Sequence, residues 1–514
     1  MSEVLTDWVA HHARHRPESV ALALAETGAT VTWGELDERV TRLAGVLRHE
    51  WGVESGARVV LVAENDPRIL ETQFACMRIG AVLMPLNWRL TAAELAEQLV
   101  DAEPSAVVHD GVWSGLVDEL AAQVALPRRM GWDAPEEIAD YEQVIASTPE
   151  RVAGGDLDPG AVTQLLYTSG TTGRPKGVLC TNRTLVTQAQ NLAHTSRMAE
   201  RGGHHLNIVP LFHAGGLNVF TNPMLYWGGR VTTVRRFDPE TTLDLLTDPE
   251  LRITHLCGVL QMHEWLTRLP AFAAARFPAL ETVLYGGWGP SALETYRAYR
   301  ERGVHVQLSY GASEIGPNVT ILSRPDDTVA EAGSSGTVAP HTRIRLTGPD
   351  GAEVAPGAAG ELWIRGGGVT PGYWRQPRSE FFDGDWFRTG DVARLDAAGH
   401  LYIVGRVKEM YRSGGENVYP AEVENVLAGM PGIAEIAVVG VPDDRWGETG
   451  LLAVVPEDGA KVTLADVHAY GAGRLARFKL PAHLLVLDEM PRSATDKISR
   501  ARIREWFLAG EGLA

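Results

Sequence analysis

The sequence contains few cysteines and no long run of apolar residues. Its three cysteines, Cys76, Cys180 and Cys257, lie far apart and form no metal-ligand spacing, so we expect reduced, mostly buried thiols in a cytoplasmic protein. No segment is long and apolar enough to span a bilayer, and the first residues lack the apolar core of a signal peptide. We therefore expect no membrane insertion.

Positive charge is also scarce. Acidic residues outnumber basic ones by 65 to 47, which gives a net charge of -18. Binding nucleic acid over a broad surface needs a basic face, so this balance argues against a nucleic-acid partner. The chain of 514 residues is too long for one ordinary core, and its 45% hydrophobic and 22% charged content is that of a soluble globular protein. Two or more domains are expected.

The order of strand and helix patterns predicts the domain organisation. Strands and helices alternate to roughly Leu260, which favours parallel sheets layered with helices. One helix is predicted to begin after Thr32, because Glu35 completes a capping box there. The expected fold is α/β, with an N-terminal core of residues 1–407, a turn-rich, β-barrel-like subdomain within it at about 333–406, and a small α+β C-terminal domain of residues 408–514.

A glycine-rich segment, LLYTSGTTGRPKGV at residues 165–178, directly follows an apolar run. Backbone N–H groups in a glycine turn can form a nest for an anion, and a lysine adds positive charge. The donors would be the hydroxyls of Thr168, Ser169, Thr171 and Thr172, the backbone at Gly170 and Gly173, and the ammonium of Lys176. Composition alone fits a phosphate loop and a flexible surface turn equally well.

Several other phosphate and hydrolase motifs do not match. A Walker A loop needs glycine immediately before its lysine, and Pro175 stands there. No nucleophile elbow of the form G-x-S-x-G occurs. His263 and Glu264 begin an H-E-x-x-H pattern, but Thr267 replaces its second histidine. That segment is therefore predicted to be an ordinary helix.

The glycine-rich segment resembles the phosphate loop of the AMP-forming acyl-CoA synthetases. These enzymes form the adenylate-forming superfamily together with luciferase and nonribosomal peptide adenylation domains. Five further blocks of the family occur here in the family's order, so the resemblance covers nearly the whole chain. The family activates a carboxylic acid with ATP and Mg²⁺ and transfers the acyl group to coenzyme A.

The resemblance implies roles for residues in the middle of the chain. His213, in PLFHAGGLN, would line the carboxylate pocket. Gly287 and Trp288, in YGGWGP, would lie near the adenine and the acyl group. The family usually has small residues where Trp288 and Gly289 stand, so Trp288 either shortens the acyl tunnel or turns into the core. In the first case a short or aromatic acid is favoured over a long chain.

The next blocks imply the nucleotide contacts. In SYGASEIGP, Tyr310 and Gly311 would pack on adenine, Ser313 would touch the α-phosphate, and Glu314 would bind Mg²⁺ with Thr168. Asp391, in WFRTGD, would accept both ribose hydroxyls, assisted by Arg406.

The resemblance also implies that the C-terminal domain moves about a hinge near Lys408 between two half-reactions. Gly414 and Gly415, in SGGENVYPAEVE, would lie beside the tunnel for the pantetheine arm of CoA. Lys497 aligns with the family's catalytic lysine, although Asp496 precedes it where the family has glycine.

The reaction expected from these residues has two steps. A carboxylate is a poor electrophile, and attaching AMP supplies a leaving group. Lys176 and its loop would hold the β- and γ-phosphates, Mg²⁺ on Glu314 would bridge phosphates, and Lys497 would reach the carboxylate and the α-phosphate. The thiol of CoA would then attack the acyl-adenylate, giving a thioester and AMP.

The departures at Trp288, Ser313 and Asp496 leave two alternatives open. One is an adenylating enzyme with another acceptor, such as a carrier protein, or nitrite in an ATP-dependent diazotisation of an aryl amine. The other is a degenerate nucleotide-sensing protein, which the intact set of Lys176, Glu314, Asp391 and Lys497 argues against. The sequence names neither the acid nor the oligomeric state, for which a homodimer is one expectation.

The assignment of Lys497 yields a prediction. Lys497→Ala should abolish adenylation of the acid, because the lysine's charge is needed where negative charge builds at the α-phosphorus. It should spare the attack of CoA on a supplied acyl-adenylate. Rapid-quench measurement of both half-reactions checks this, and equal loss of both would refute the division of labour.

Overall fold

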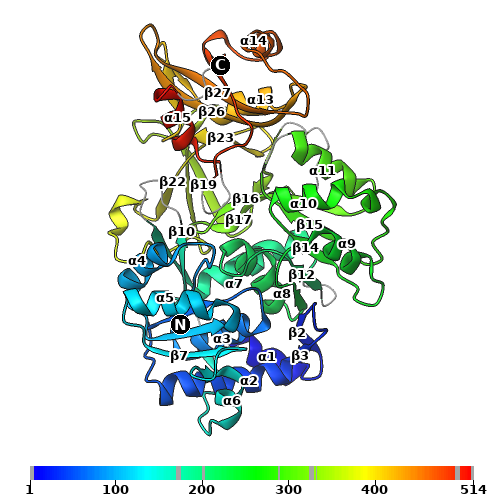
Figure 1. The fold of residues 1–514 in the computed structure, drawn as a ribbon, viewed down its shortest axis with the longest axis vertical. Helices are drawn as coiled ribbons and strands as arrows, with labels where there is room; N and C mark the ends of the chain where they lie inside the picture. Colours follow the sequence, from blue (N-terminus) through cyan, green and yellow to red (C-terminus); the bar gives the residue numbers. More distant parts are fainter. Residues whose placement is uncertain are drawn as a thin grey trace.

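The computed structural model describes residues 5–168, 175–198, 203–287, 290–322, 329–330, 333–492 and 498–510. A larger part carries the helices α1 to α11 and two wide sheets, and a smaller part at the other end of the long axis carries α13, α14 and α15 (Figure 1). The strands β19, β22 and β23 lie between the two parts in this view. The fold is mixed α/β, as expected from the sequence.

Two largely parallel sheets form the larger part. The first has the order β11-β10-β5-β4-β6-β7-β8, and its only antiparallel pair among the described strands is the hairpin β10–β11. Its strands are β4 (Arg58–Val62), β5 (Val82–Pro85), β6 (Ala106–Asp110), β7 (Arg128–Trp132), β8 (Ala139–Asp140), β10 (Val162–Thr168) and β11 (Lys176–Thr181).

The second sheet has the order β18-β17-β16-β15-β14-β12-β13-β2-β3, parallel in its centre and antiparallel at both ends. Its strands are β2 (Val20–Leu24), β3 (Thr30–Thr32), β12 (His204–Asn207), β13 (Arg230–Thr233), β14 (His255–Cys257), β15 (Thr282–Tyr285), β16 (His305–Ala312), β17 (Gly316–Leu322) and β18 (Thr337–Val338). A separate two-stranded ribbon joins β1 (Leu5–Thr6) to β9 (Asp156–Leu157).

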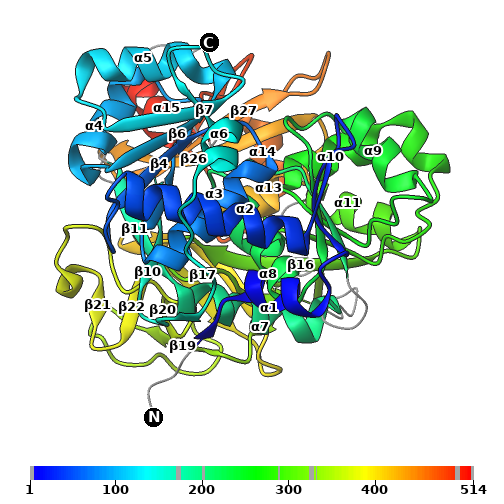
Figure 2. The ribbon, with the colours of Figure 1, turned by 90° about the horizontal axis from the view of Figure 1, so that it is seen from below.

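Helices cover and connect these sheets. Figure 2 shows α2 and α3 lying side by side in the view from below, and α3 contacts strands of both sheets. The helices are α1 (Trp8–His15), α2 (Trp33–Gly45), α3 (Pro67–Ile79), α4 (Ala92–Ala102), α5 (Ser114–Gln123), α6 (Tyr141–Ser147), α7 (Asn182–Ser196), α8 (Asn222–Tyr226), α9 (Pro239–Thr247), α10 (Leu260–Arg268) and α11 (Pro290–Arg300). The capping box predicted for Thr32 and Glu35 is confirmed at the start of α2. The helix predicted around His263 is also confirmed, as α10.

Two further sheets follow in the chain, the first antiparallel and the second antiparallel except for its parallel pair β27–β28. One contains β19 (Thr342–Thr347), β20 (Gly360–Gly366), β21 (Phe382–Asp383), β22 (Trp386–Leu395) and β23 (Leu401–Arg406), as the turn-rich texture predicted. The other contains β24 (Tyr411–Ser413), β25 (Glu416–Val418), β26 (Ile433–Asp443), β27 (Gly447–Pro456) and β28 (His483–Val486), accompanied by α13 (Pro420–Leu427), α14 (Leu464–Gly471) and α15 (Arg500–Leu508). Because one sheet ends at Arg406 and the next begins at Tyr411, we propose that the domains join at residues 407 and 408.

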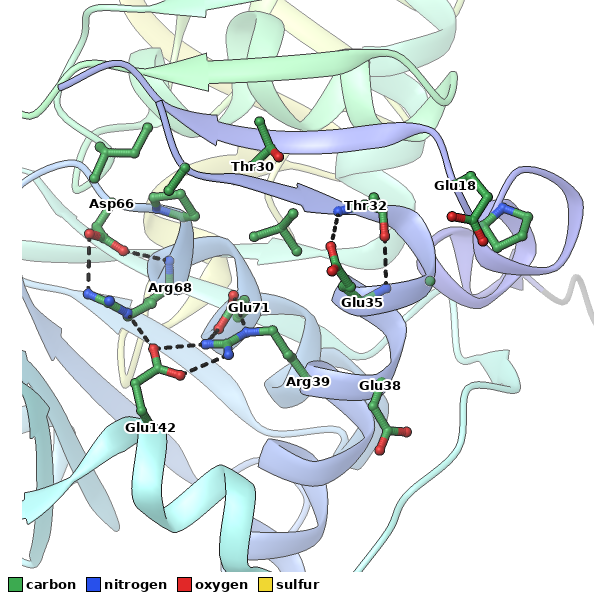
Figure 3. A pocket seen from close by; sticks show the side chains of 16 residues that line it. Glu18, Thr30, Thr32, Glu35, Glu38, Arg39, Asp66, Arg68, Glu71 and Glu142 are labelled. Carbon is green, nitrogen blue, oxygen red and sulfur yellow. Dashed lines mark hydrogen bonds and ion pairs between the residues drawn. The ribbon is translucent and has the colours of Figure 1, made fainter. Parts of the chain in front are cut away.

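An ionic network centred on the buried Glu71 joins α2, α3 and α6 beside a cavity of about 710 Å³ (Figure 3). Arg39 donates to both carboxylate oxygens of Glu71, at 2.7 and 2.9 Å, and also to Glu142 at 2.8 Å. Tyr141 donates its hydroxyl to Glu71 at 2.9 Å, and Arg68 donates to Glu142 at 2.9 Å. Only 1% of the Glu71 side chain is exposed, so its charge depends on these partners.

Removing the buried carboxylate should destabilise the larger part of the molecule. Glu71→Ala leaves Arg39 and Tyr141 without their buried acceptor, and we expect a loss of about 3 kcal/mol in the free energy of unfolding. Glu38→Ala on the adjacent helix α2 is the control, because its pairs with Arg42 and Arg151 are partly exposed and are each worth less than about 1 kcal/mol. Urea-induced unfolding measures both. Equal losses would contradict a structural role for the network.

Candidate active site

The glycine-rich segment lies in the hairpin formed by β10 and β11. Thr168 ends β10, Lys176 begins β11, and the two residues face each other in the register of the sheet. A side chain at Gly177 would lie 2.7 Å from Leu165 and 3.2 Å from Trp374, so only glycine lets the chain at Trp374 pack against this strand. The amide of Trp374 donates to the carbonyl of Gly177 at 2.8 Å. The base of the loop is therefore fixed by backbone contacts.

Lys176 lies against two aromatic rings. Its ammonium is 4.5 Å from the centre of the Phe381 ring and 5.3 Å from that of Tyr373, within the range of cation–π attraction. The Tyr373 hydroxyl donates to Glu314 Oε1 at 3.0 Å. Burial, together with the charge of Glu314, raises the pKa of Tyr373 well above its ordinary value, so the hydroxyl remains a proton donor. Tyr373 thus contacts both Lys176 and Glu314.

Glu314 lies in the tight turn between β16 and β17. A side chain at Gly311 would lie 2.2 Å from the carbonyl group of Pro317, so glycine is required where β16 enters the turn. The carbonyl of Glu314 accepts a hydrogen bond from the amide of Thr370 at 2.8 Å, and Ser313 beside it is half-buried. The turn is therefore held from both ends.

A second cluster consists of Tyr310, Asp391 and Arg406. Tyr310 precedes Glu314 by four residues in the chain. The Tyr310 hydroxyl donates to Asp391 Oδ2 at 2.5 Å, and Arg406 donates to Asp391 Oδ1 at 2.9 Å. Asp391 and Arg406 are register partners on β22 and β23, whereas Tyr310 belongs to β16. Burial and the charge of Asp391 raise the pKa of Tyr310 well above its ordinary value. The carboxylate of Asp391 is thereby held in one orientation by two donors.

His213 and Gly287 each follow a strand of the second sheet, β12 and β15. His213 is half-buried, lies after β12, and its ring centre is 4.7 Å from that of Phe212. Gly287 follows β15 with a φ of 108°, a backbone conformation that glycine adopts readily. Ala214, next to His213, lines one small cavity together with Ser313. The His213 segment and the β16–β17 turn therefore meet.

Gly414 and Gly415 form the turn between β24 and β25. Their φ values are 61° and 89°, and such a pair of positive angles is typical of a two-residue hairpin turn. A side chain at Gly414 would also lie 3.0 Å from the Trp446 ring. The hairpin itself therefore accounts for both glycines, in addition to any role beside a thiol arm.

The structure does not describe every residue predicted for the site. Lys497, Trp288, Ser169, Gly170, Thr171, Thr172 and Gly173 lie outside the described residues. Conversely, sequence reasoning missed Tyr373, which contacts both Lys176 and Glu314. No local pattern marks it, because its position depends on a bridge to Val178, far away in the chain.

The three cysteines are free and buried, as predicted. Burial, with a smaller contribution from Glu314, raises the pKa of Cys180 to about 12. No group of three or more histidine, cysteine or acidic side chains in the described part of the chain could hold a metal ion by itself. Among the described helices, none combines the length and the apolar character needed to cross a bilayer.

Comparisons with known proteins agree with this architecture. A family model described as AMP-binding enzyme matches residues 9–374, and one described as AMP-binding enzyme C-terminal domain matches residues 422–497. Similar curated proteins include feruloyl-CoA synthase of an Amycolatopsis species, 38% identical, with 98% of this chain and 99% of the relative covered. Another is indoleacetate–CoA ligase of Aromatoleum aromaticum, 36% identical, with 98% of each chain covered.

A solved structure extends the comparison. The amide bond synthetase of Marinactinospora thermotolerans superimposes with a TM-score of 0.86 at 26% identity, covering 98% of this chain and 99% of that one. The chain belongs to the AMP-forming acyl-CoA synthetases of the adenylate-forming superfamily. It is a carboxylate–CoA ligase of a class that uses ATP, Mg²⁺ and CoA.

The tight turn at Gly311 generates a prediction. In Gly311→Ala the added methyl group collides with the Pro317 carbonyl, which must displace Ser313 and Glu314. We expect ATP–pyrophosphate exchange to fall by about a hundredfold, the usual cost of misplacing catalytic groups by about 1 Å. Gly115→Ala on α5, where the added methyl group meets nothing within 4 Å, is the control. An unchanged exchange rate in Gly311→Ala would contradict this account.

Proposed function

We propose that the chain activates a short or aromatic carboxylic acid as acyl-AMP, releases pyrophosphate and transfers the acyl group to CoA. The observation that carries this proposal is the convergence of Lys176 and Glu314 on Tyr373, next to the cluster of Tyr310, Asp391 and Arg406. A cation, a carboxylate suited to Mg²⁺ and a ribose-binding carboxylate are the groups that such a reaction requires.

The phosphate end of ATP would lie at the β10–β11 hairpin. Cation–π contacts hold Lys176, and no carboxylate among the described residues pairs with it, so its charge is available to an anion. Within this proposal the donors of residues 168–173 and Lys176 bind the β- and γ-phosphates. Repulsion between the triphosphate and the incoming carboxylate is thereby offset.

Glu314 and Thr168 fit a Mg²⁺ ion that is shared with phosphates. Magnesium is usually held by one or two carboxylates together with phosphates, and not by a cage made only of protein. The residues present agree with this preference. Glu314 is a single half-buried carboxylate, and the described residues contain no group of three or more histidine, cysteine or acidic side chains that could hold a metal ion. Bound there, Mg²⁺ supplies charge neutralisation for the phosphates, while Tyr373 orients the carboxylate that holds it.

The nucleoside would be held by the second cluster. Asp391 has its carboxylate fixed by Tyr310 and Arg406, and each carboxylate oxygen retains a lone pair that can accept from a ribose hydroxyl. Tyr310, Gly311 and Gly287 would border the adenine, with Trp288 near the acyl group. Ser313 would donate to the α-phosphate.

The acid and the thiol would enter from different sides. His213 would line the carboxylate pocket, and Lys497 would reach between the carboxylate and the α-phosphate during adenylation. The hairpin at Gly414 and Gly415 would border the pantetheine arm after the C-terminal domain has turned about the hinge near residue 408. The free, buried cysteines support a reducing compartment, and we place the enzyme in the cytoplasm.

A second acceptor remains a candidate because of one comparison. The second candidate is an enzyme that passes its acyl-adenylate to an amine. The likeness to an amide bond synthetase, with a TM-score of 0.86, supports this candidate. The two candidates share the first step and differ only in the nucleophile. The close match of Gly414 and Gly415 to the family's CoA block supports the thiol.

A panel of carboxylic acids with ATP and Mg²⁺, each with and without CoA, tests the proposal. We expect pyrophosphate release with short or aromatic acids, and a thioester together with AMP only when CoA is present. Mass spectrometry measures both products. The amine acceptor would be favoured if adenylate forms but CoA does not consume it. No nucleotide cleavage with any acid would refute the activity.

A further inference from the structure

A small cavity lies directly behind the β16–β17 turn. Its walls come from five places in the chain: β11, α7, the segment after His213, the turn itself and the segment at residues 368–370. Its lining includes Cys180, Gln188, Ala214, Asn218, Ser313 and Gly316. Because Ser313 belongs to both the cavity and the proposed nucleotide site, a group placed at the α-phosphate reaches the cavity from one side. The cavity therefore adjoins the proposed position of the α-phosphate.

Gln188 lines this cavity. Its side chain is 3% exposed, and its Oε1 has no hydrogen-bond partner within the described part of the chain. A side chain at Gly316 would lie 1.7 Å from Gln188 Nε2, and one at Gly368 would lie 2.3 Å from it. The amide therefore rests on two bare backbones that leave it room. A buried acceptor without a donor is costly unless a ligand supplies one.

The neighbouring amides make the contrast. Asn218 lines the same cavity, but it donates to Gln164 Oε1 at 2.8 Å and accepts from Asn222 at 2.8 Å. Gln164 in turn donates to Gln73 Oε1 at 2.8 Å. These four side chains satisfy one another in a closed network on the core side. Gln188 stands outside this network.

We propose that Gln188 determines substrate specificity by accepting a hydrogen bond from an O–H or N–H group at the far end of the acid. This inference rests on the proposed function and narrows it to aryl acids with a phenol hydroxyl or a ring N–H. The cavity has a volume of about 10 Å³, which is near the minimum for a single water molecule. It admits a small polar tip, while the ring stays on the side of Ser313.

Matched acids test the inference on the wild-type enzyme. We expect kcat/KM in ATP–pyrophosphate exchange to be about tenfold higher for 4-hydroxycinnamate than for 4-fluorocinnamate, because the fluorine is of similar size and cannot donate. Indole-3-acetate and benzothiophene-3-acetate form a second pair that differs in the N–H. Equal use of both members of each pair, or a preference for the member that only accepts, would overturn the inference.

Variants of α7 assign the preference to one side chain. Gln188→Met has similar length without the acceptor, and it should bring the ratio within each pair close to one, mainly through a higher KM for the donor acid. Gln188→Glu keeps an oxygen acceptor and should retain the preference. Gln190→Met is the matched control, because Gln190 lies on the same helix and hydrogen-bonds Tyr226. A preference that survives in Gln188→Met would overturn the assignment.

The outcomes separate this inference from the proposed function. Exchange with both members of a pair at equal rates overturns only the role of Gln188. Absence of exchange with every acid of the panel overturns the proposed function and the inference with it. The wild-type comparison needs no variant, so a variant that fails to fold leaves the test intact.

Discussion

The contact of Tyr373 with Lys176 and Glu314 is the interaction on which the candidate site depends. A lysine and a glutamate that approached each other freely would form an ion pair and cancel their charges. Here the aromatic ring attracts the ammonium while its hydroxyl engages the carboxylate. Both charges thus stay close together but remain directed to a third partner. Such an arrangement fits a phosphate group that is bound together with a metal cation.

The arrangement needs three sheets, because its groups come from strands of all three. Lys176 begins β11 of the first sheet, Tyr310 and Glu314 lie at the end of β16 of the second, and Asp391 lies on β22 of the antiparallel sheet. The hydrogen bond from Tyr310 to Asp391 joins the second sheet to the antiparallel one. The ionic network around Glu71 secures the helices beneath the first two sheets. Packing far from the chemistry therefore sets its geometry.

Local patterns predicted much of this fold, since their physics is local. The capping box at Thr32, the strand before the glycine-rich segment and the helix at His263 all depend on residues within a few positions of one another. Tyr373 and Gln188 gave no such signal. Tyr373 is positioned by a backbone bridge to Val178. Gln188 has room because Gly316 and Gly368 carry no side chain. Such relations arise only when distant segments meet, and a single sequence does not display them.

The burial of Cys180 carries a consequence for the survival of the enzyme during turnover. A mixed anhydride formed beside Ser313 would acylate any thiolate within reach, and Cys180 lines the adjoining cavity. Burial raises the pKa of the Cys180 thiol far above neutral pH, so the thiol stays protonated and unreactive. Acylation of Cys180 by the acyl-adenylate is thereby avoided, and the intermediate stays available to the incoming nucleophile.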